Sequence, residues 1–427
     1  MQLSQTTSRK LAAARDLLAV AAFCAAVFYG GRAFINSPYL QKERVTQREA
    51  AADIETFFRL AAETRPAPAA GETGPDLRAL KAAAHAEAEA RLDEFKRVTV
   101  RDLAFILYRA AAAFGESETR LLWQPRRKYR DPELKFPPFT AEYREGKFFI
   151  RRAADPALTG AELLQINGVA SKDYIRPALE RISGETPALR AWLFCRDQAF
   201  WWEFAALVAA DKPLEIKART GPGKTLARRA APVTAGEFRR LSDRHAPQHK
   251  MIYSQSKLAW LQVYDLEASR NARRFNEFFF GEARTKGAQV LVLDLREAAV
   301  GERKEADRLA ALITGFRSGT PAAKAFLLIG PGTGPAAAYL AARFRELGAG
   351  EILGGETGGT PAYFGDPETF TLPASGLKFS VASRRYPYPV SRPGGVPPDT
   401  VLTAELLRPF KGDLKAYIMK RTGVSAK

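Results

Sequence analysis

Cysteine, histidine and methionine are scarce in this chain of 427 residues, which has two cysteines, three histidines and three methionines. Cys24 and Cys195 cannot form a disulfide framework, and no cluster of cysteine and histidine has the spacing of zinc ligands. The sequence therefore predicts neither a metal site nor a cofactor.

Acidic residues are also in short supply, since 65 lysines and arginines face 47 aspartates and glutamates and leave a formal charge of +18. The basic residues are spread along the whole chain, which favours attraction to anionic surfaces but indicates no particular reaction. No nucleic-acid-binding motif accompanies the charge, so no nucleic-acid partner is predicted. A dispersed basic surface is the simpler interpretation.

The chain lacks a hydrophobic run of the about 20 residues that a membrane span needs. Its longest N-terminal uncharged run, residues 17–31, follows Arg9, Lys10 and Arg15. This pattern predicts that residues 1–40 are a signal peptide or a short signal-anchor, with the uncleaved anchor favoured. Because positive charge stays inside, the rest of the chain is expected on the periplasmic side of the inner membrane, in the cell envelope.

Apolar residues make up 46% of the chain, enough for sizeable cores in two or three domains. Helical apolar spacing at residues 47–63, 77–95 and 100–114 predicts an N-terminal helical region over residues 41–135. These helices are expected to form a small bundle.

Residues 136–240 have the pattern of a small β-rich module. Strand alternation at 145–152 and 213–220 flanks a hairpin at 160–169, whose Asn167-Gly168 pair is a strong turn signal. The hairpin resembles the Gly-x-x-Ile-x-x-Ile-Asn-Gly hairpin of PDZ domains. The resemblance implies a PDZ-like module that binds extended carboxyl termini by strand addition, or a PDZ-like spacer that binds nothing. Its candidate binding residues are Leu164, Ile166, Asn167 and Gly168.

An aromatic stretch at residues 189–208 departs from a minimal module of this kind. Its regular apolar spacing predicts a helical insertion that packs on the bundle or on the sheet. A groove for apolar peptide side chains is the alternative.

Residues 250–427 alternate strands with helices, which predicts an α/β layered domain. The apolar strand 325–329 leads through the turn Gly330-Pro331-Gly332-Thr333-Gly334 to a helix over 335–347. Turns of this kind place free backbone N–H groups at a helix N-terminus, where they suit an anion or oxyanion.

Two segments in this domain resemble the nucleophile region of the tail-specific, or C-terminal-processing, serine peptidases. These are Thr333-Gly-Pro-Ala-Ala337 and Gly355-Glu-Thr-Gly-Gly359, beside the family patterns Gly-x-x-Thr-x-Ser-Ala-Ala and Val-Gly-Glu-x-Thr-x-Gly. Asp294-Leu295-Arg296 resembles the start of the family's oxyanion loop, and residues 395–399 its Gly-Ile-x-Pro-Asp signature. The resemblance implies an α/β fold with a crotonase/Clp-like β-α spiral core, a PDZ-like module and an N-terminal helical bundle.

The catalytic positions that the resemblance implies hold unsuitable residues. Pro335 replaces the serine nucleophile, Glu118 the histidine base of the tricorn-related branch, and Thr360 the lysine base of the other branch. Asp294, Leu295, Arg296 and Ala336 stand at the oxyanion positions, but Glu297-Ala-Ala299 replaces glycine-rich sequence. Because nucleophile and base act as one unit, losing both costs a rate factor on the order of 10⁶.

The sequence therefore predicts an exported, membrane-anchored, non-catalytic relative that binds a polypeptide or a protein carboxyl terminus. Two alternatives stay open: an active serine-type peptidase with a relocated nucleophile, Thr333 or a serine elsewhere, and a structural envelope protein. A new acidic site formed by Glu116, Glu118 and Glu356 is a further interpretation, beside ordinary solvated turns. The oligomeric state is left undetermined.

Overall fold

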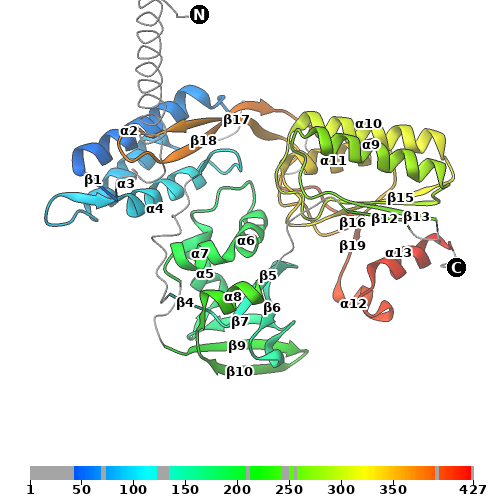
Figure 1. Cartoon of the computed structure of the whole chain (residues 1–427), viewed down its shortest axis with the longest axis horizontal. Helices are drawn as coiled ribbons and strands as arrows, with labels where there is room; N and C mark the ends of the chain where they lie inside the picture. Colours follow the sequence, from blue (N-terminus) through cyan, green and yellow to red (C-terminus); the bar gives the residue numbers. More distant parts are fainter. Residues whose placement is uncertain are drawn as a thin grey trace, which may run out of the picture.

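The computed structural model describes residues 43–68, 74–122, 134–207, 212–242, 250–253, 257–389 and 394–424. The predicted signal or anchor segment, residues 1–40, lies outside these ranges. Within them, no helix is both long and apolar enough to cross a membrane. Figure 1 shows three parts that lie next to one another: an N-terminal helical region, an antiparallel sheet with its own helices, and an α/β sheet.

The N-terminal region contains helices α2 (Gln47–Thr64), α3 (Leu77–Glu89) and α4 (Val100–Ala112), with β1 (Arg44–Thr46) paired to β2 (Arg97–Thr99). Helix α3 is shorter than the predicted span of 77–95. Asp93 accepts hydrogen bonds from the backbone N–H groups of Phe95 and Arg97, and Lys96 has a φ of 53°. This local turn competes with the helix and ends it early.

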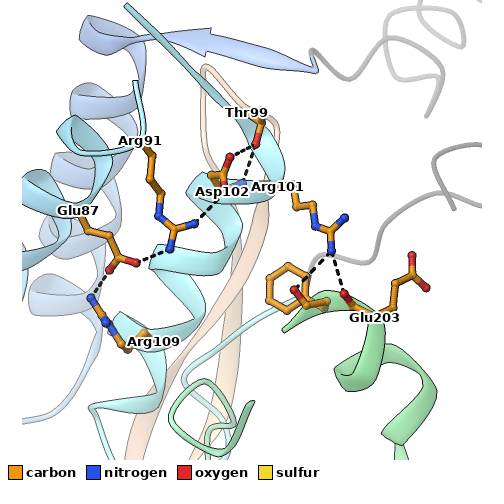
Figure 2. Close-up of polar contacts among 8 residues, drawn as sticks. Glu87, Arg91, Thr99, Arg101, Asp102, Arg109 and Glu203 are labelled. Carbon is orange, nitrogen blue, oxygen red and sulfur yellow. Dashed lines mark hydrogen bonds and ion pairs between the residues drawn. The ribbon is translucent and has the colours of Figure 1, made fainter. Parts of the chain in front are cut away.

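Charged side chains join α3, α4 and the helix α7 (Gln198–Phe204), as Figure 2 shows. Glu87 accepts hydrogen bonds from both Arg91 and Arg109, and Arg91 also donates to Asp102 at 2.8 Å. Arg101 donates to the carbonyl of Glu203 at 2.9 Å. A cation beside the carbonyl groups at a helix C-terminus is favourable, so Arg101 stabilises the packing of α7 on α4.

An antiparallel sheet has the strand order β10-β9-β7-β6-β5, with β8 paired to β7. Its strands are β5 (Phe139–Arg144), β6 (Lys147–Ala153), β7 (Glu162–Ile166), β8 (Val169–Ala170), β9 (Leu214–Gly221) and β10 (Lys224–Ala230). The predicted hairpin turn is confirmed, since Asn167 and Gly168 both have positive φ, 51° and 78°. The short strands β4 (Lys135–Phe136) and β11 (Val233–Thr234), the 3₁₀ helix Pro156–Leu158 and helix α8 (Ala235–Leu241) complete this part.

The aromatic stretch forms two helices, α6 (Pro187–Arg196) and α7, after helix α5 (Ser171–Leu179). The prediction of one helical stretch was incomplete, because Asp197 has φ −110° and ψ 31° and separates the two. We call α6 and α7 together the aromatic insertion.

The α/β sheet has the order β12-β13-β14-β15-β16-β19, and every pair except β12 with β13 is parallel. Its strands are β12 (Lys250–Tyr253), β13 (Leu258–Gln262), β14 (Val290–Asp294), β15 (Lys324–Ile329), β16 (Glu351–Gly354) and β19 (Thr400–Val401). Helices α9 (Arg270–Thr285), α10 (Arg303–Gly319) and α11 (Pro335–Glu346) pack on one face. Helices α12 (Ala404–Leu407) and α13 (Leu414–Thr422), with the 3₁₀ helix Arg408–Phe410, pack on the other.

A third sheet joins strands from the N-terminal and the C-terminal parts of the chain. Strands β17 (Tyr363–Thr371) and β18 (Lys378–Tyr386) form a hairpin, and β3 (Arg120–Leu121) pairs with β18. The hairpin extends from the α/β part to the N-terminal helices (Figure 1). There Phe379 packs on Phe57 of α2 with ring centroids 4.9 Å apart, and buried Asp53 accepts the N–H groups of Ala374 and Ser375.

Candidate functional site

Pro335 stands at the first position of α11, where the resemblance implies a serine nucleophile. It is buried, and its ring offers neither a hydroxyl nor an N–H. The backbone of Gly359 lies directly against it, since a Cβ added at Gly359 would come within 2.3 Å of the Pro335 nitrogen. A nucleophile is therefore absent from this position, and the space beside it is filled by main chain.

The threonine hydroxyls around this turn are committed to the backbone. Thr333 is fully buried, donates to the carbonyl of Leu295 at 2.9 Å and accepts the N–H of Gly330 at 3.0 Å. Thr360, at the lysine-base position, donates to the carbonyl of Ala362 at 2.6 Å. Thr357 donates to the carbonyl of Gly359 at 2.7 Å. These bonds fix the turns and leave the hydroxyls poorly placed for attack on a substrate.

The loop after β14 presents carbonyl groups to the turn. Asp294, at the end of β14, is buried and accepts from the Arg296 guanidinium at 2.7 and 2.8 Å. The N–H of Gly334 donates to the carbonyl of Ala298 at 2.9 Å, and the N–H of Thr333 to that of Gly330. The N–H groups of Thr333 and Gly334 are therefore occupied, whereas an oxyanion hole needs free donors. Leu295 and Ala336, which stand at two of the four predicted oxyanion positions, are buried core residues.

Helix α6 covers the same turn. A Cβ added at Gly332 would lie 2.3 Å from the Trp192 ring and 2.4 Å from the carbonyl oxygen of Arg296. Leu189, Trp192 and Ala299 form a small apolar cluster of their own, and Thr186 donates to the carbonyl of Gly358 at 2.6 Å. Helix α6 of the aromatic insertion thus packs over the turn that leads into Pro335.

Glu118, at the histidine-base position, is partly buried in the turn before β3. Burial raises the pKa of its carboxyl, and the neighbouring carboxylates of Glu116 and Asp366 raise it further, while Arg120 opposes them. Glu116 has its own ion pair with Arg65 at 2.9 Å, and Glu356 accepts the N–H of Gly395. In the described residues no group of three histidine, cysteine or acidic side chains could hold a metal ion.

The residues that the sequence predicts for peptide binding form the β7–β8 hairpin of the antiparallel sheet. Ile166 is fully buried, and the side-chain oxygen of Asn167 accepts the N–H of Glu215 at 2.9 Å. Leu164 is half-buried and Gly168 is exposed in the turn. The structure gives Ile166 and Asn167 structural contacts within the sheet.

The edge of the antiparallel sheet at β5 is closed by the aromatic insertion. Gln198 of α7, which is buried, accepts the N–H of Ala141 at 2.9 Å and directs its amide nitrogen to the carbonyl of Ala141 at 3.4 Å. Trp202 packs edge-on against Phe139 of β5 and lies 6.4 Å from the ring of Tyr174 on α5. The side chains of α7 therefore occupy the space between β5 and α5 where an added strand would lie.

Sequence reasoning did not identify Gln198, nor the contact between Ser117 and Glu185. The Ser117 hydroxyl donates to Glu185 at 2.6 Å and its backbone N–H donates to the same carboxyl at 2.9 Å. Burial raises the pKa of Glu185 to about 7. Both contacts join residues far apart in the chain, and no local sequence pattern predicts them.

No protein-family model matches the chain, and no curated protein does. Among solved structures, mature CPAF complexed with lactacystin is similar, with a TM-score of 0.56, 12% identity, and coverage of 88% of this chain and 98% of that one. A second structure of mature CPAF gives the same TM-score of 0.56 at 12% identity, and the match covers 88% of this chain and 96% of the CPAF chain. The photosystem II D1 C-terminal processing protease matches at a TM-score of 0.45 and 15% identity, over 86% of this chain and 95% of that one. The chain has a mixed α/β fold of the tail-specific-protease type.

Proposed function

We propose that this chain, which has the tail-specific-protease fold, is a non-catalytic relative that binds a polypeptide, either a carboxyl terminus or a partner protein. The observation that carries the proposal is Pro335 at the start of α11, in a turn whose Thr333 and Gly334 N–H groups donate to backbone carbonyls. Acyl transfer requires a nucleophile, a base and free oxyanion donors together. This turn supplies no nucleophile.

The antiparallel sheet, in this proposal, belongs to a PDZ-like module, and the α/β part is a β-α spiral core. A PDZ domain binds a carboxyl terminus by adding it as a strand in the groove beside a helix. Here the aromatic insertion fills the groove between β5 and α5, with the Gln198 amide against Ala141. Ligand binding by strand addition would require α7 to leave, so the polypeptide site lies elsewhere on the chain.

We further propose that residues 1–40 anchor the chain to a membrane and that the remainder is exported. The support is the charge step from Arg9, Lys10 and Arg15 to the uncharged run 17–31. The formal charge of +18 would add attraction to anionic lipid headgroups.

The test uses the purified full chain and a fluorescently labelled unfolded protein. The expected result is retention of the labelled protein on an affinity column that carries the chain, with no cleavage over many hours. Pro335→Ala is the matched control, and it should change neither the retention of the labelled protein nor the absence of cleavage. Cleavage that a single serine or threonine substitution abolishes would contradict the proposal.

A relocated serine nucleophile is a second candidate function, and one observation favours it. Ser117 donates to the carboxyl of Glu185, whose raised pKa of about 7 suits a general base. This reading predicts that the chain cleaves unfolded protein and that Ser117→Ala abolishes cleavage, whereas Ser183→Ala, a serine that donates to the carbonyl of Thr119, leaves it intact.

A further inference from the structure

Strand β10 forms an open edge of the antiparallel sheet. It stands at the end of the strand order, and its partner among the described strands is β9 alone. Figure 1 shows β10 at the outer end of the sheet, away from the N-terminal helices and the α/β part. All of its residues are exposed except Leu226 and Ala230, which are half-buried. Because α7 closes the opposite edge at β5, β10 is the edge that can pair with another chain.

The pairing of β9 determines which backbone groups of β10 face outward. The carbonyl of Glu215 accepts an N–H of the β7–β8 turn at 2.8 Å, so the next residue, Ile216, directs its backbone groups to β10. Arg228 is paired with Ile216 and therefore faces β9. Since the direction alternates along a strand, Ala227 and Arg229 present their N–H and C=O groups to the outside. The Arg228 guanidinium donates to the carbonyl of Ala227 at 3.2 Å, in keeping with a carbonyl that does not pair with β9.

The side chains along this edge are mainly basic. Strands β9 and β10 contain one acidic residue, Glu215, and the basic residues Lys217, Arg219, Lys224, Arg228 and Arg229. Two of the arginines are in ion pairs, one with Glu162 at 2.9 Å and the other with Asp155 at 3.2 Å. Lys217, Lys224 and Arg229 are exposed and have no ion-pair partner within the described part of the chain. The edge therefore suits an acidic partner.

We propose that β10 binds an extended acidic segment of a partner polypeptide, which adds to the antiparallel sheet as a new edge strand. The backbone groups of Ala227 and Arg229 supply the main-chain hydrogen bonds, and Lys217, Lys224 and Arg229 select acidic side chains. Pairing with β10 of a second copy would bring like charges together, which disfavours a dimer through this edge. This inference rests on the proposed function and names its site, which needs neither a free carboxyl terminus nor the groove beside α5.

The test titrates the full chain with a fluorescent peptide in which glutamate and threonine alternate and both ends are capped, by acetyl and amide groups. Fluorescence anisotropy reports the affinity. A second peptide is methylated at every backbone nitrogen, so it keeps the charge but donates no N–H. It is expected to bind about tenfold or more weakly, because an added strand depends on its main-chain hydrogen bonds. A third peptide, with lysine in place of glutamate, should not bind, because like charges repel.

Ala227→Pro removes an outward N–H, and an edge strand tolerates proline at such a position. It is expected to weaken the acidic peptide about tenfold, and Arg229→Gln about two- to fivefold. The matched controls lie on α8: Ala235→Pro at the first helical position, which suits proline, and Arg239→Gln at an exposed position. Neither control should change the affinity. If Ala227→Pro fails to fold, by circular dichroism, the methylated peptide on the unaltered chain still decides.

Failure of the acidic peptide to bind, with the labelled unfolded protein still retained on the column, would overturn the inference and leave the proposed function standing. If the chain binds neither, both are wrong. Equal affinities for the methylated and unmodified peptides would mean that charge alone holds the peptide, and strand addition would be wrong. Undiminished binding by Ala227→Pro would place the peptide away from β10 and would also overturn the inference.

Discussion

At the scale of single residues, Pro335 occupies a position that suits proline. Proline is favoured at the first position of a helix, where its missing N–H would have no partner and its fixed φ suits the helix. The residue therefore fits the N-terminus of α11. Proline therefore carries no structural penalty at this position.

Restoring a hydroxyl alone is not expected to restore catalysis. Pro335→Ser places a hydroxyl at a buried helix N-terminus whose backbone packs against Gly359, and Glu118 remains at the position of the histidine. We expect no cleavage of unfolded protein, and a loss of unfolding free energy of about 0.5–1 kcal/mol, because serine gives the unfolded chain more freedom. Urea denaturation and a fluorescent cleavage assay check both. Cleavage by this single variant would show that a working base and oxyanion site survive.

Gly359 is required by close packing against Pro335. A Cβ at this position would lie 2.3 Å from the Pro335 nitrogen, so Gly359→Ala should lower the free energy of unfolding by about 1–3 kcal/mol. Gly315, inside α10 with open space around it, is the control, and Gly315→Ala should raise stability by about 0.5–1 kcal/mol. Urea denaturation measures both variants, and changes in the urea midpoint that have the same sign for Gly359→Ala and Gly315→Ala would contradict this packing.

Glu185 makes stability depend on pH. Its pKa is raised from 4.5 to about 7 by burial, so between these values the folded chain holds a proton that the unfolded chain releases. Stability conferred by the protonated carboxyl is therefore lost as pH rises through this window. Glu185→Gln stays neutral, so its stability relative to the unaltered chain should increase from pH 5 to pH 8 in urea denaturation.

Glu237→Gln provides the control for that pH series. Hydrogen bonds from Thr234 lower the pKa of Glu237, so its carboxyl is ionised in both the folded and the unfolded chain between pH 5 and 8. Its stability difference should not change across this range. A flat difference for Glu185→Gln as well would mean that Glu185 titrates normally.

At the scale of elements, the local patterns of the sequence predict where helices and strands form. Apolar spacing located α2, α4 and α11, and Asn167-Gly168 located its turn. The errors occur where a single side chain or backbone angle ends an element, as with Asp93 after α3 and Asp197 between α6 and α7. Apolar periodicity does not report such events.

The closed edge of β5 depends on one amide. Gln198→Ala removes the acceptor of the buried N–H of Ala141, which should lower the free energy of unfolding by about 1–3 kcal/mol. Gln289→Ala, at an exposed position just before β14, should change it by less than about 0.5 kcal/mol. Urea denaturation compares the two. If the two variants were equally stable, the Gln198 amide would not be what closes this edge.

At the scale of the whole molecule, the parts that matter for the site come from distant stretches of sequence. The hairpin β17–β18 packs on α2 through Phe57 and Phe379, and α6 covers the turn at Gly332 through Trp192. The order of motifs predicted the fold type, and the residues at the family's catalytic positions could be identified from their place in the sequence. The covering role of the aromatic insertion and the committed N–H of Gly334 could not, because each depends on long-range packing.

The most direct test of the central claim compares the full chain with the double variant Pro335→Ser, Glu118→His in cleavage of an unfolded protein. The account predicts that the natural chain retains the protein and cleaves none of it, and that the double variant also fails to reach the rate of an active protease, since the N–H of Gly334 and the Gly332 turn stay covered. Cleavage by the natural chain that is abolished by one serine or threonine substitution, Ser117→Ala first among them, would show that the nucleophile has moved and that the non-catalytic assignment is wrong.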